Sequence, residues 1–549
     1  MSKALEGAAL LGGAVALGAL AFFQPELLAS PLFDKLWASL ILGGISMEAG
    51  AIAGALTSNR GSNITIRQPA SFRQITYGEQ RIGGNLVYPS TTGGHHDQYN
   101  KIIVLAGHEI DSIVNLYLDG RQVYWNVGSI NNVTRNGVNF GGDADHHDHT
   151  GPNGERYNFG TLVYCEARFG DQRPGDYMTS IQANDPTWGP TSAGTPYLGG
   201  CAYVYLKVEF DTAMFSTEPE VRFTIRGKND ILDPRTRVRG YTNNWALIAA
   251  DILTDTEFGL GDVGSVNTDQ LIAAANVCDE LVPLAAGGAE KRYCCNWHYD
   301  TSTTPGDALQ TIMPAAAGRL SRIGGEWYIW PAYWQGPSFA FDEGIFTAPI
   351  EWMPYRSFRD LTNRITGTYT APNYPYNMAG NLYDANGWYY GTKQNNFPFA
   401  FQPTNYPQYA MDVRHGYASD AFLEEDGGIL LPREIAQQTV LSVAQAQRVA
   451  KIYLLRNRQQ GSGTFSMGLA AFGMQPCSVF TQTFKLYGWT GKVLEVDSFS
   501  FKIDGGGNGN PPSIRTEFKV IETSAAVYEW HASEELTVYD VPAFQPYST

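Results

Sequence analysis

The sequence predicts a multi-domain, mainly β protein with an α+β segment between two β-rich regions. The first observation is length: the chain has 549 residues, against about 100–200 for a typical domain. The second is that short runs rich in Val, Ile, Tyr and Phe, separated by turn residues, fill 61–235 and 461–530. The third is a series of segments with helical periodicity between 236 and 335.

Residues 1–60 are an apolar, Gly- and Ala-rich segment that we expect to be helical. Residues 8–23 carry no charge, whereas a second apolar stretch, residues 36–56, contains Glu48. A membrane-spanning helix needs about 20 apolar residues, so the first stretch is short and the second is charged. A basic residue before the first stretch favours a signal peptide, but a neighbouring acidic residue and the lack of a clean cleavage site argue against one.

Glycine and alanine recur at close spacing in both apolar stretches, which lets helix backbones approach closely in lipid or in a protein bundle. The sequence leaves both settings open. The hypothesised contacts of an axial bundle or of a membrane are Leu10, Leu11, Val15, Leu17, Leu20, Phe22, Phe23, Leu40, Ile41 and Ile45.

Residues 61–235 are predicted to be a β-rich domain with a loop insertion at 126–159. The expected strands lie at 74–88, 161–169, 202–210 and 221–227. Asp119-Gly120, between NLYL and RQVYW, is a strong signal for a type I′ hairpin. The insertion is rich in Gly, Asn, Asp and His, which are typical of extended loops.

Residues 236–335 are predicted to be a mixed α/β domain. The first helix is expected in TNNWALIAADILTD, with Asn243 or Asn244 as its N-cap. This helix places three apolar residues on one face: Trp245, Ile248 and Ile252. The segment NTDQLIAAANVCDEL predicts a one-sided amphipathic helix with Leu271, Ala274, Cys278 and Leu281. PGDALQTIMPAAAGRL predicts a third helix, followed by a strand pair over 318–331.

Residues 336–460 are predicted to be an irregular β domain with a long helix at 432–458. Pro432 suits the first turn of this helix, and its basic end suits the helix dipole. Residues 368–410 are rich in Tyr, Phe, Trp and Asn, which suits either ring stacking on a sugar or burial at a subunit interface; we favour the interface. Residues 461–549 are predicted to return to β structure and to end in a tail.

Composition limits the partners of this chain. Its net charge is −16 and its pI is about 5.0, whereas sequence-independent binding of nucleic acid needs clustered Lys and Arg. Charged residues make up only 17% and aromatic residues 13%. So few charges on a chain of this size indicate that neighbouring proteins cover much of its surface.

The six cysteines include no CxxC pair, so a zinc or iron–sulfur site built by this chain alone is not expected. Free thiols in a reducing cytoplasm are the simpler interpretation. The segment GLGDVG at 259–264 matches GxGxxG but follows a predicted helix rather than a strand. It therefore predicts a turn and not a dinucleotide site.

Two groups of side chains could suggest further chemistry. Histidines gather in two loops: His95, His96, His146, His147 and His149. No ligand spacing fixes a metal geometry there, so solvated loops are favoured. Glu109 and Asp111 lie between two predicted strands, which favours a β-turn over a glycosidase pair. Because GxSxG, HExxH and GxxxxGK[ST] do not occur either, we predict no catalytic residue, cofactor or metal, and no enzymatic activity.

Five segments in this order resemble one known family: ITYGEQRIGGNLVY, IVLAGHEIDSIVNLYLDGRQV, WALIAADILTDTEFGLG, RYCCNWHYDTSTTPGDALQTIMPAAAGRLSRIGGEWYIWPA and VIETSAAVYEW. The family is the tail-tip hub of long-tailed, siphovirus-type bacteriophages, that of the lambda tip attachment protein. The resemblance covers roughly residues 67–530. It implies a homotrimer that closes the distal end of a six-fold tail tube, with two tube-like β-barrel domains in each subunit, one of them in residues 461–549.

The resemblance also implies a location and partners. The protein is expected at the distal end of the tail of the virion, after synthesis in the host cytoplasm. Its expected partners are a second and third copy of itself, the distal tail or tube protein, an adjacent minor tail-tip protein, the tape-measure protein and a receptor-binding or central fibre. Phage DNA is expected to pass without specific binding, and the host envelope is a further contact during ejection.

Relatives continue into fibronectin-like domains and a receptor-binding fibre, whereas this sequence ends at residue 549. We therefore expect a separate fibre to bind the receptor. Two alternatives to the structural hub stay open. One is a tip protein that itself binds a receptor or glycan, and the other is a membrane-active ejection protein that acts through its N-terminus.

Overall fold

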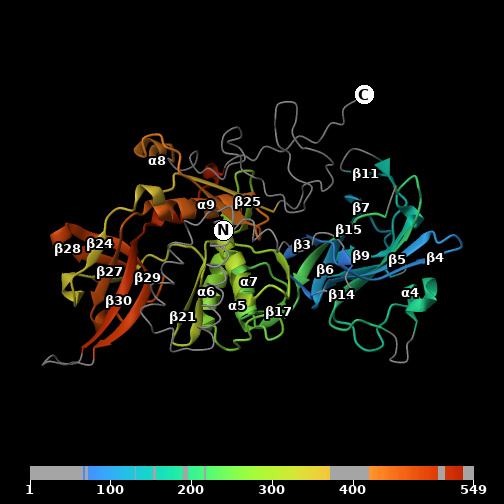
Figure 1. The fold of residues 1–549 in the computed structure, drawn as a ribbon, viewed down its shortest axis with the longest axis horizontal. Coiled ribbons are helices and arrows are strands. Elements are labelled where there is room, and N and C mark those ends of the chain that lie inside the picture. The colour runs from blue at the N-terminus through green and yellow to red at the C-terminus, as the bar shows by residue number, and fades with distance from the viewer. Residues whose placement is uncertain are drawn as a thin grey trace, which may run out of the picture. The chain divides into compact units, whose positions relative to one another are not determined.

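The computed structural model describes residues 66–67, 72–129, 131–151, 156–189, 196–215, 218–370, 419–504 and 513–535, drawn in colour in Figure 1. They all fall within one compact unit, residues 61–549. Residues 1–60, with the hypothesised contacts from Leu10 to Ile45, lie outside the described residues, as do residues 371–418, which include most of the aromatic-rich run at 368–410. No helix in the described part of the chain is long and apolar enough to cross a membrane.

Two β-sheets pack around one core in the first β-rich region, and we call them the N-terminal sheets. One has six strands in the order β1 (Ile66–Arg67), β4 (Asn85–Thr92), β5 (Gln98–Ala106), β14 (Ala202–Glu209), β13 (Val163–Phe169) and β10 (Gly142–Asp143). The other has four, in the order β3 (Glu79–Ile82), β15 (Val221–Lys228), β6 (Ile110–Leu118) and β7 (Arg121–Val123). Alternating side chains of both sheets, such as Ile103 and Phe223, meet in this core.

The six-stranded sheet is buried on its outer face as well. There Tyr203 and Tyr205 of β14 pack with Met178 and Ile181, at and within helix α4 (Thr179–Asn184). With both faces covered, β14 is buried along most of its length. This explains why its sequence is apolar without a clean alternation.

The predicted strands of this region are confirmed, and so is the type I′ turn. Asp119 and Gly120 join β6 to β7 with φ values of +48° and +79°, the left-handed conformation that both central residues of this turn need. The prediction that 126–159 is an extended loop is wrong in part. It carries short strands: β8 (Val133–Arg135), β9 (Val138–Phe140), β10, β11 (His149–Thr150) and β12 (Arg156–Tyr157). Phe140 and Tyr157 from this insertion are buried in the core and hold it against the sheets.

Residues 74–88, the first segment predicted as β structure, contribute to three strands that do not pair with one another. Strand β2 (Gln74–Tyr77) pairs with β20 (Trp297–Asp300), more than 200 residues away. Strand β3 pairs with β15, and β4 with β5. Strand β2, between β1 and β3 in the sequence, therefore belongs to the middle of the protein and not to the N-terminal sheets.

The middle of the protein is built around helices α5 (Trp245–Thr254), α6 (Thr268–Asp279) and α7 (Pro305–Ile312), and we call it the helical core. Hairpins surround the helices: β16 (Ile231–Asp233) with β17 (Val238–Gly240), β18 (Leu281–Pro283) with β19 (Ala289–Lys291), and β21 (Arg319–Ile323) with β22 (Glu326–Trp330). All three helices and the β21–β22 pair were predicted. Two details were wrong. Helix α5 is buried on all sides rather than on one, and Leu281 lies beyond α6, in β18, and is exposed.

Asn244, and not Asn243, is the N-cap of α5. Its Oδ1 accepts hydrogen bonds from the backbone N–H groups of Ala246 (3.1 Å) and Leu247 (3.3 Å), while its Nδ2 donates to Ala275 O (2.9 Å). The side chain is fully buried. One side chain therefore pairs two free backbone N–H groups at the start of α5 and also holds α6 beside this helix.

We expect Asn244→Ala to lower the free energy of unfolding by about 2 kcal/mol, because it removes a helix cap and leaves a buried carbonyl unpaired. Asn243→Ala is the matched control and should change stability by less than about 0.5 kcal/mol. Urea unfolding followed by circular dichroism measures both. Equal losses in the two variants would contradict the assignment of the cap.

Helix α9 (Val443–Arg458) corrects the prediction of a helix over 432–458. Its N-cap is Ser442, which accepts a hydrogen bond from Gln445 N. Residues Pro432–Gln437 form strand β26, paired in parallel with β25 (Arg364–Tyr369). The pairing partner lies more than 60 residues away, so tertiary contact overrides the helical pattern of the sequence here. Helix α8 (Ser419–Glu425) precedes β26.

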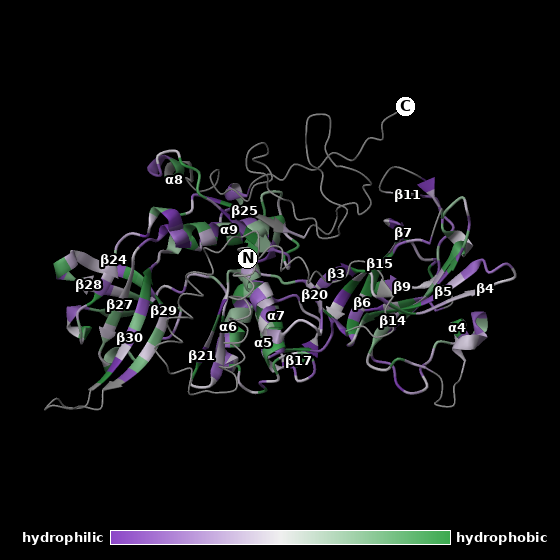
Figure 2. Cartoon of the chain, viewed as in Figure 1, coloured by the Kyte–Doolittle hydropathy of each residue, from purple (hydrophilic) through white to green (hydrophobic). Residues whose placement is uncertain are grey.

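The last region is a six-stranded sheet, the C-terminal sheet. Its strand order is β23 (Pro337–Phe341), β28 (Val479–Phe484), β29 (Trp489–Asp504), β30 (Ser513–Glu522), β27 (Ser462–Met467) and β24 (Glu351–Met353). Short 3-10 helices connect elements throughout: Gly160–Leu162, Pro186–Trp188, Met313–Ala316, Glu343–Ile345, Phe358–Asp360, Leu469–Ala471, Lys485–Tyr487, Ala525–Val527 and Ala532–Glu534. Figure 2 shows hydrophobic and hydrophilic residues mixed along the strands of the sheets, as expected where one face packs on a core.

The mainly β architecture with an α+β middle is confirmed, but no closed barrel is found among the strands that the structure describes. The order of the C-terminal sheet ends at β23 and β24, and these two strands do not pair with each other. The N-terminal sheets likewise end in the short strands β1, β10, β3 and β7. In both regions, the apolar face of the sheets is buried in a hydrophobic core.

Candidate functional site

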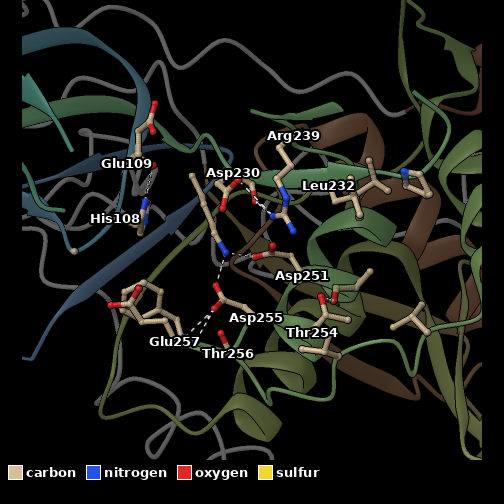
Figure 3. A pocket seen from close by; sticks show the side chains of 18 of the residues that line it. His108, Glu109, Asp230, Leu232, Arg239, Asp251, Thr254, Asp255, Thr256 and Glu257 are labelled. Carbon is tan, nitrogen blue, oxygen red and sulfur yellow. Dashed lines mark hydrogen bonds and ion pairs between the residues drawn. The ribbon is translucent and has the colours of Figure 1, made fainter. Parts of the chain in front are cut away.

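A cavity of about 880 Å³ lies where the N-terminal sheets meet the helical core. Its walls come from the turn between β5 and β6, the end of β15, and helix α5 with the segment that follows it. Figure 3 shows His108 and Glu109 on one side of this cavity, and Asp251 and Asp255 on the other. These elements come from distant parts of the sequence, so only the fold creates the site.

A buried lysine between two carboxylates is the centre of this site. Lys228 Nζ lies 2.6 Å from Asp251 Oδ2 and also contacts Asp255 Oδ2. Tyr77 OH donates a hydrogen bond to the same oxygen of Asp251, at 2.7 Å. Lys228 ends β15, Asp251 belongs to α5, and Asp255 is its C-cap. We call this group the Lys228 joint.

Charge pairing outweighs burial at Lys228. Burial alone would lower the pKa of the ammonium group, but Asp251 and Asp255 raise it above its usual value, so Lys228 is charged. Burial raises the pKa of Asp251. It opposes the charge of Asp255 too, but hydrogen bonds from Lys228 and from two backbone N–H groups hold the pKa of that carboxyl below its usual value.

Two buried histidines clamp Thr76 of β2 beside the Lys228 joint. His108 Nδ1–H donates to Glu109 O (2.8 Å), and His108 Nε2 accepts from Thr76 N (3.0 Å). His298 Nδ1 is hydrogen-bonded to Thr76 Oγ1 at 2.7 Å. An imidazole that donates at one nitrogen and accepts at the other is neutral. His108 therefore holds the backbone of Thr76, and His298 holds its side chain.

Burial lowers the pKa of both rings to about 4. The charge of Lys228 adds to this effect at His108, although the hydrogen bond to the Glu109 carbonyl works against it. His108 in turn disfavours the charge on His298. Both histidines thus stay uncharged near neutral pH.

Charged groups near the rim of the cavity pair both between these two parts of the protein and within the N-terminal part. Arg73 forms an ion pair with Glu257 and lies over the ring of Phe258, 5.9 Å from its centroid. Glu109 accepts from Arg135 at 2.5 Å and from Asn229 at 3.2 Å. Each charged side chain of this group therefore has an oppositely charged neighbour.

A second ionic joint links the helical core to the C-terminal sheet. Arg319 of β21 lies 2.8 Å from the buried Glu495 of β29, which also accepts a hydrogen bond from Tyr528 OH at 2.8 Å. Arg456 of α9 lies over the Tyr528 ring, 5.4 Å from its centroid. The carboxylate of Glu495 raises the pKa of Arg319 despite its burial. We call this group the Arg319 joint.

The acidic residues, the glycine-rich segment and the cysteines noted in the sequence can each be located in the fold. Glu109 lies in the β5–β6 turn, as predicted, whereas Asp111 lies within β6 and accepts from Asn136 Nδ2 at 2.6 Å. GLGDVG is a turn between α5 and α6, and Gly261 and Gly264 have φ values of +74° and +77° there. The six cysteines are free thiols, as predicted.

The histidines of the 146–149 loop form polar contacts and a ring contact. Asp145 accepts from His149 Nε2 (2.8 Å) and lies 3.3 Å from His147 Nδ1, and His149 stacks on Tyr124 with ring centroids 3.9 Å apart. Over the described ranges, no three His, Cys, Asp or Glu side chains gather in a way that could hold a metal ion.

Sequence reasoning missed both joints. One signal was present: Asp251 interrupts the apolar run WALIAADIL, and an acid in the middle of a buried helix needs a cation. The partner, Lys228, could not be identified from the sequence. It follows the predicted strand at 221–227, and that prediction does not say which helix the end of the strand contacts.

No protein-family model matches the chain, and no curated protein matches it. Among solved structures, it is similar to a chain from the virion of a native gene transfer agent particle. The two are 11% identical, the match covers 91% of this chain and 98% of that one, and the TM-score is 0.50. The chain therefore shares its fold with a virion protein.

Two further structures are looser matches. The 43 kDa tail protein of a prophage from Shewanella oneidensis is 11% identical, with 84% of this chain and 96% of that one covered and a TM-score of 0.26. A prophage tail protein from Listeria monocytogenes is 11% identical, with 44% and 58% covered and a TM-score of 0.22.

Proposed function

We propose that this protein is a structural hub at the tip of a phage-like tail. Three copies close the distal end of the tail tube, organise the tail-tip and fibre proteins around them, and open for genome ejection. The observation that carries this proposal is the fold shared with a gene transfer agent virion chain over nearly the full length of both. The order of five segments that resemble tail-tip hubs supports it.

The internal arrangement of the chain suits such a role. The N-terminal sheets and the C-terminal sheet have separate cores, and the Lys228 and Arg319 joints fix each of them to the helical core. Three copies would present six sheet-bearing parts to a six-fold tube. Rigid joints matter for this task, because a ring closes only if every subunit holds the same geometry.

The work of the hub is packing, and we propose no catalytic activity for it. Its partners would be neighbouring copies, the distal tail or tube protein, a minor tail-tip protein, the tape-measure protein and a fibre. The net charge of −16 would keep passing DNA from adhering if acidic residues face the lumen.

We expect the purified full chain to form a trimer, with a mass three times the 60.3 kDa of the chain. Mass photometry and sedimentation over a concentration series measure this. Electron microscopy of the same sample should show three-fold symmetry. A chain that stays monomeric at every concentration, or that forms an even-numbered ring, would overturn the proposal.

A further inference from the structure

The longest hairpin of the C-terminal sheet continues beyond its neighbouring strands, as the β29–β30 pair in Figure 1 shows. Strand β28 pairs with β29 only as far as Glu495, and β27 pairs with β30 only as far as Thr516. From Ser498 to Asp504, β30 is the one described strand that pairs with β29. The outer edge of β29 is therefore free in this stretch of the described chain.

The apolar face of this hairpin continues past the core of the sheet. Phe518 is fully buried, and Phe499 opposite it packs against the core. Further along the same face, Phe501, one step beyond Phe499, is 43% exposed, and Ile514, two steps beyond Phe518, is 45% exposed. Register places these residues on one face, because opposite residues of paired strands share a side.

Two neighbouring side chains extend this exposed surface. Phe472 lies edge-on to Phe501, with ring centroids 5.6 Å apart, and is 59% exposed. Leu469, in the 3-10 helix just before Phe472, is 56% exposed. We call Leu469, Phe472, Phe501 and Ile514 the hairpin patch. A free strand edge beside an apolar patch is the surface onto which a further strand adds.

The opposite face of the hairpin is basic, although the chain is acidic. Lys502 faces Arg515 across the pair, and Lys519 lies opposite Ser498. The acids of this stretch are Glu517, 2.5 Å from Lys502, and Asp504, at the end of β29. This excess of positive charge favours an acidic partner, and a second copy of the chain, with a net charge of −16, meets that condition.

We propose that the free edge of β29 and the hairpin patch bind a second copy of this chain, which adds a strand edge to β29 and covers the four apolar side chains. The inference rests on the proposed function, since it names the contact that joins the copies of the hub. It assigns this contact to one end of the C-terminal sheet and leaves the joints of the helical core intact.

A photo-crosslinking amino acid at position 501 of the full chain tests the contact. We expect ultraviolet light to join two chains through this position, and mass spectrometry of the product to place the crosslink in a second copy. The same amino acid at position 486 is the control, because Leu486 is 80% exposed at the far end of the same sheet and should give no such product. Crosslinks at 486 equal to those at 501 would overturn the inference.

A second measurement uses Phe501→Ser with Ile514→Thr. We expect this variant to raise the concentration needed for assembly by roughly tenfold or more, because apolar area at the contact is lost. Leu486→Ser should leave it unchanged. Both variants alter exposed side chains, so their unfolding midpoints should match that of the original chain.

Two negative outcomes separate this inference from the proposed function. If the chain is a trimer but the variant assembles normally and position 501 gives no crosslink between copies, the hairpin contact is wrong and the hub stands. If the chain stays monomeric at every concentration, both fail.

Discussion

Replacing Lys228 by Met is expected to lower the free energy of unfolding by about 3–5 kcal/mol, because a buried ion pair loses its cation. Lys228 and Asp251 are each 7% exposed, and Asp255 is 12% exposed. Without Lys228, two carboxylates would face one another in a place that water hardly reaches. Urea unfolding of the full chain measures the loss, and hydrogen exchange should locate it in β15 and α5, with the C-terminal sheet unaffected.

Two further variants make the reason for this loss testable. Lys485→Met removes an 86% exposed lysine that lies 4.0 Å from Glu343, and it should cost less than about 0.5 kcal/mol. Adding Asp251→Asn to Lys228→Met should recover part of the stability, because the amide carries no charge and its oxygen can still accept from Tyr77. If the double variant is less stable than Lys228→Met alone, unpaired charge is not the cause.

Acid is expected to destabilise the protein between pH 6.5 and pH 4 through His108 and His298. Their pKa values are about 4 in the folded protein, against an ordinary value of 6.5. The unfolded chain thus binds more protons in this range, so stability is complete above pH 6.5 and falls as the pH falls toward 4. Each ring accounts for roughly 3 kcal/mol over that interval.

The structural cause is the clamp on Thr76. A proton on His108 Nε2 would replace the acceptor of the Thr76 N–H with a donor, and it would place a positive charge near Lys228. Asp255 and Asp300 favour a proton on His108 and His298, respectively, but burial outweighs them. Opening of the clamp would free β2 from the N-terminal sheets first.

His298→Asn tests this directly. The amide can keep the hydrogen bond to Thr76 Oγ1 but does not titrate, so the stability of the variant should depend less steeply on pH between 6.5 and 4. The slope should fall by the equivalent of up to one proton. His95→Asn changes an exposed histidine in the β4–β5 loop and should keep the original slope. An unchanged slope in His298→Asn would rule out the clamp as the acid-sensitive group.

Local structure was largely predictable from the sequence where neighbouring residues decide it. Asp119-Gly120 predicted its turn because few other residue pairs adopt two left-handed conformations in a row. Helices α6 and α7 followed from periodicity, and the strands β13 to β15 followed from short runs rich in β-branched and aromatic residues. The start of α9 could not be predicted, because Pro432 suits both the first turn of a helix and a strand. Residues Pro432–Gln437 form a strand because they pair with β25.

The two joints were beyond the reach of pattern reasoning. Asp251 could be marked as an acid in need of a cation, but Lys228 and Tyr77 reach it only after β15 and β2 have been placed against α5. The pairing of β2 with β20 is of the same kind. Lys228 is only 23 residues from Asp251 and β20 is more than 200 residues from β2, but both contacts depend on how whole elements pack and leave no local pattern.

The sequence by itself determined many local elements of this protein: short strands, three central helices and the Asp119-Gly120 turn. These depend on backbone conformation and side-chain periodicity, which act over a few residues. Only the tertiary structure decided that the described strands do not close into a barrel, that the outer edge of β29 is free within the described chain, and that buried ions join the sheets to the helical core. Those features depend on which distant surfaces meet, because burial changes the energy of a charge or an unpaired edge far more than sequence context does.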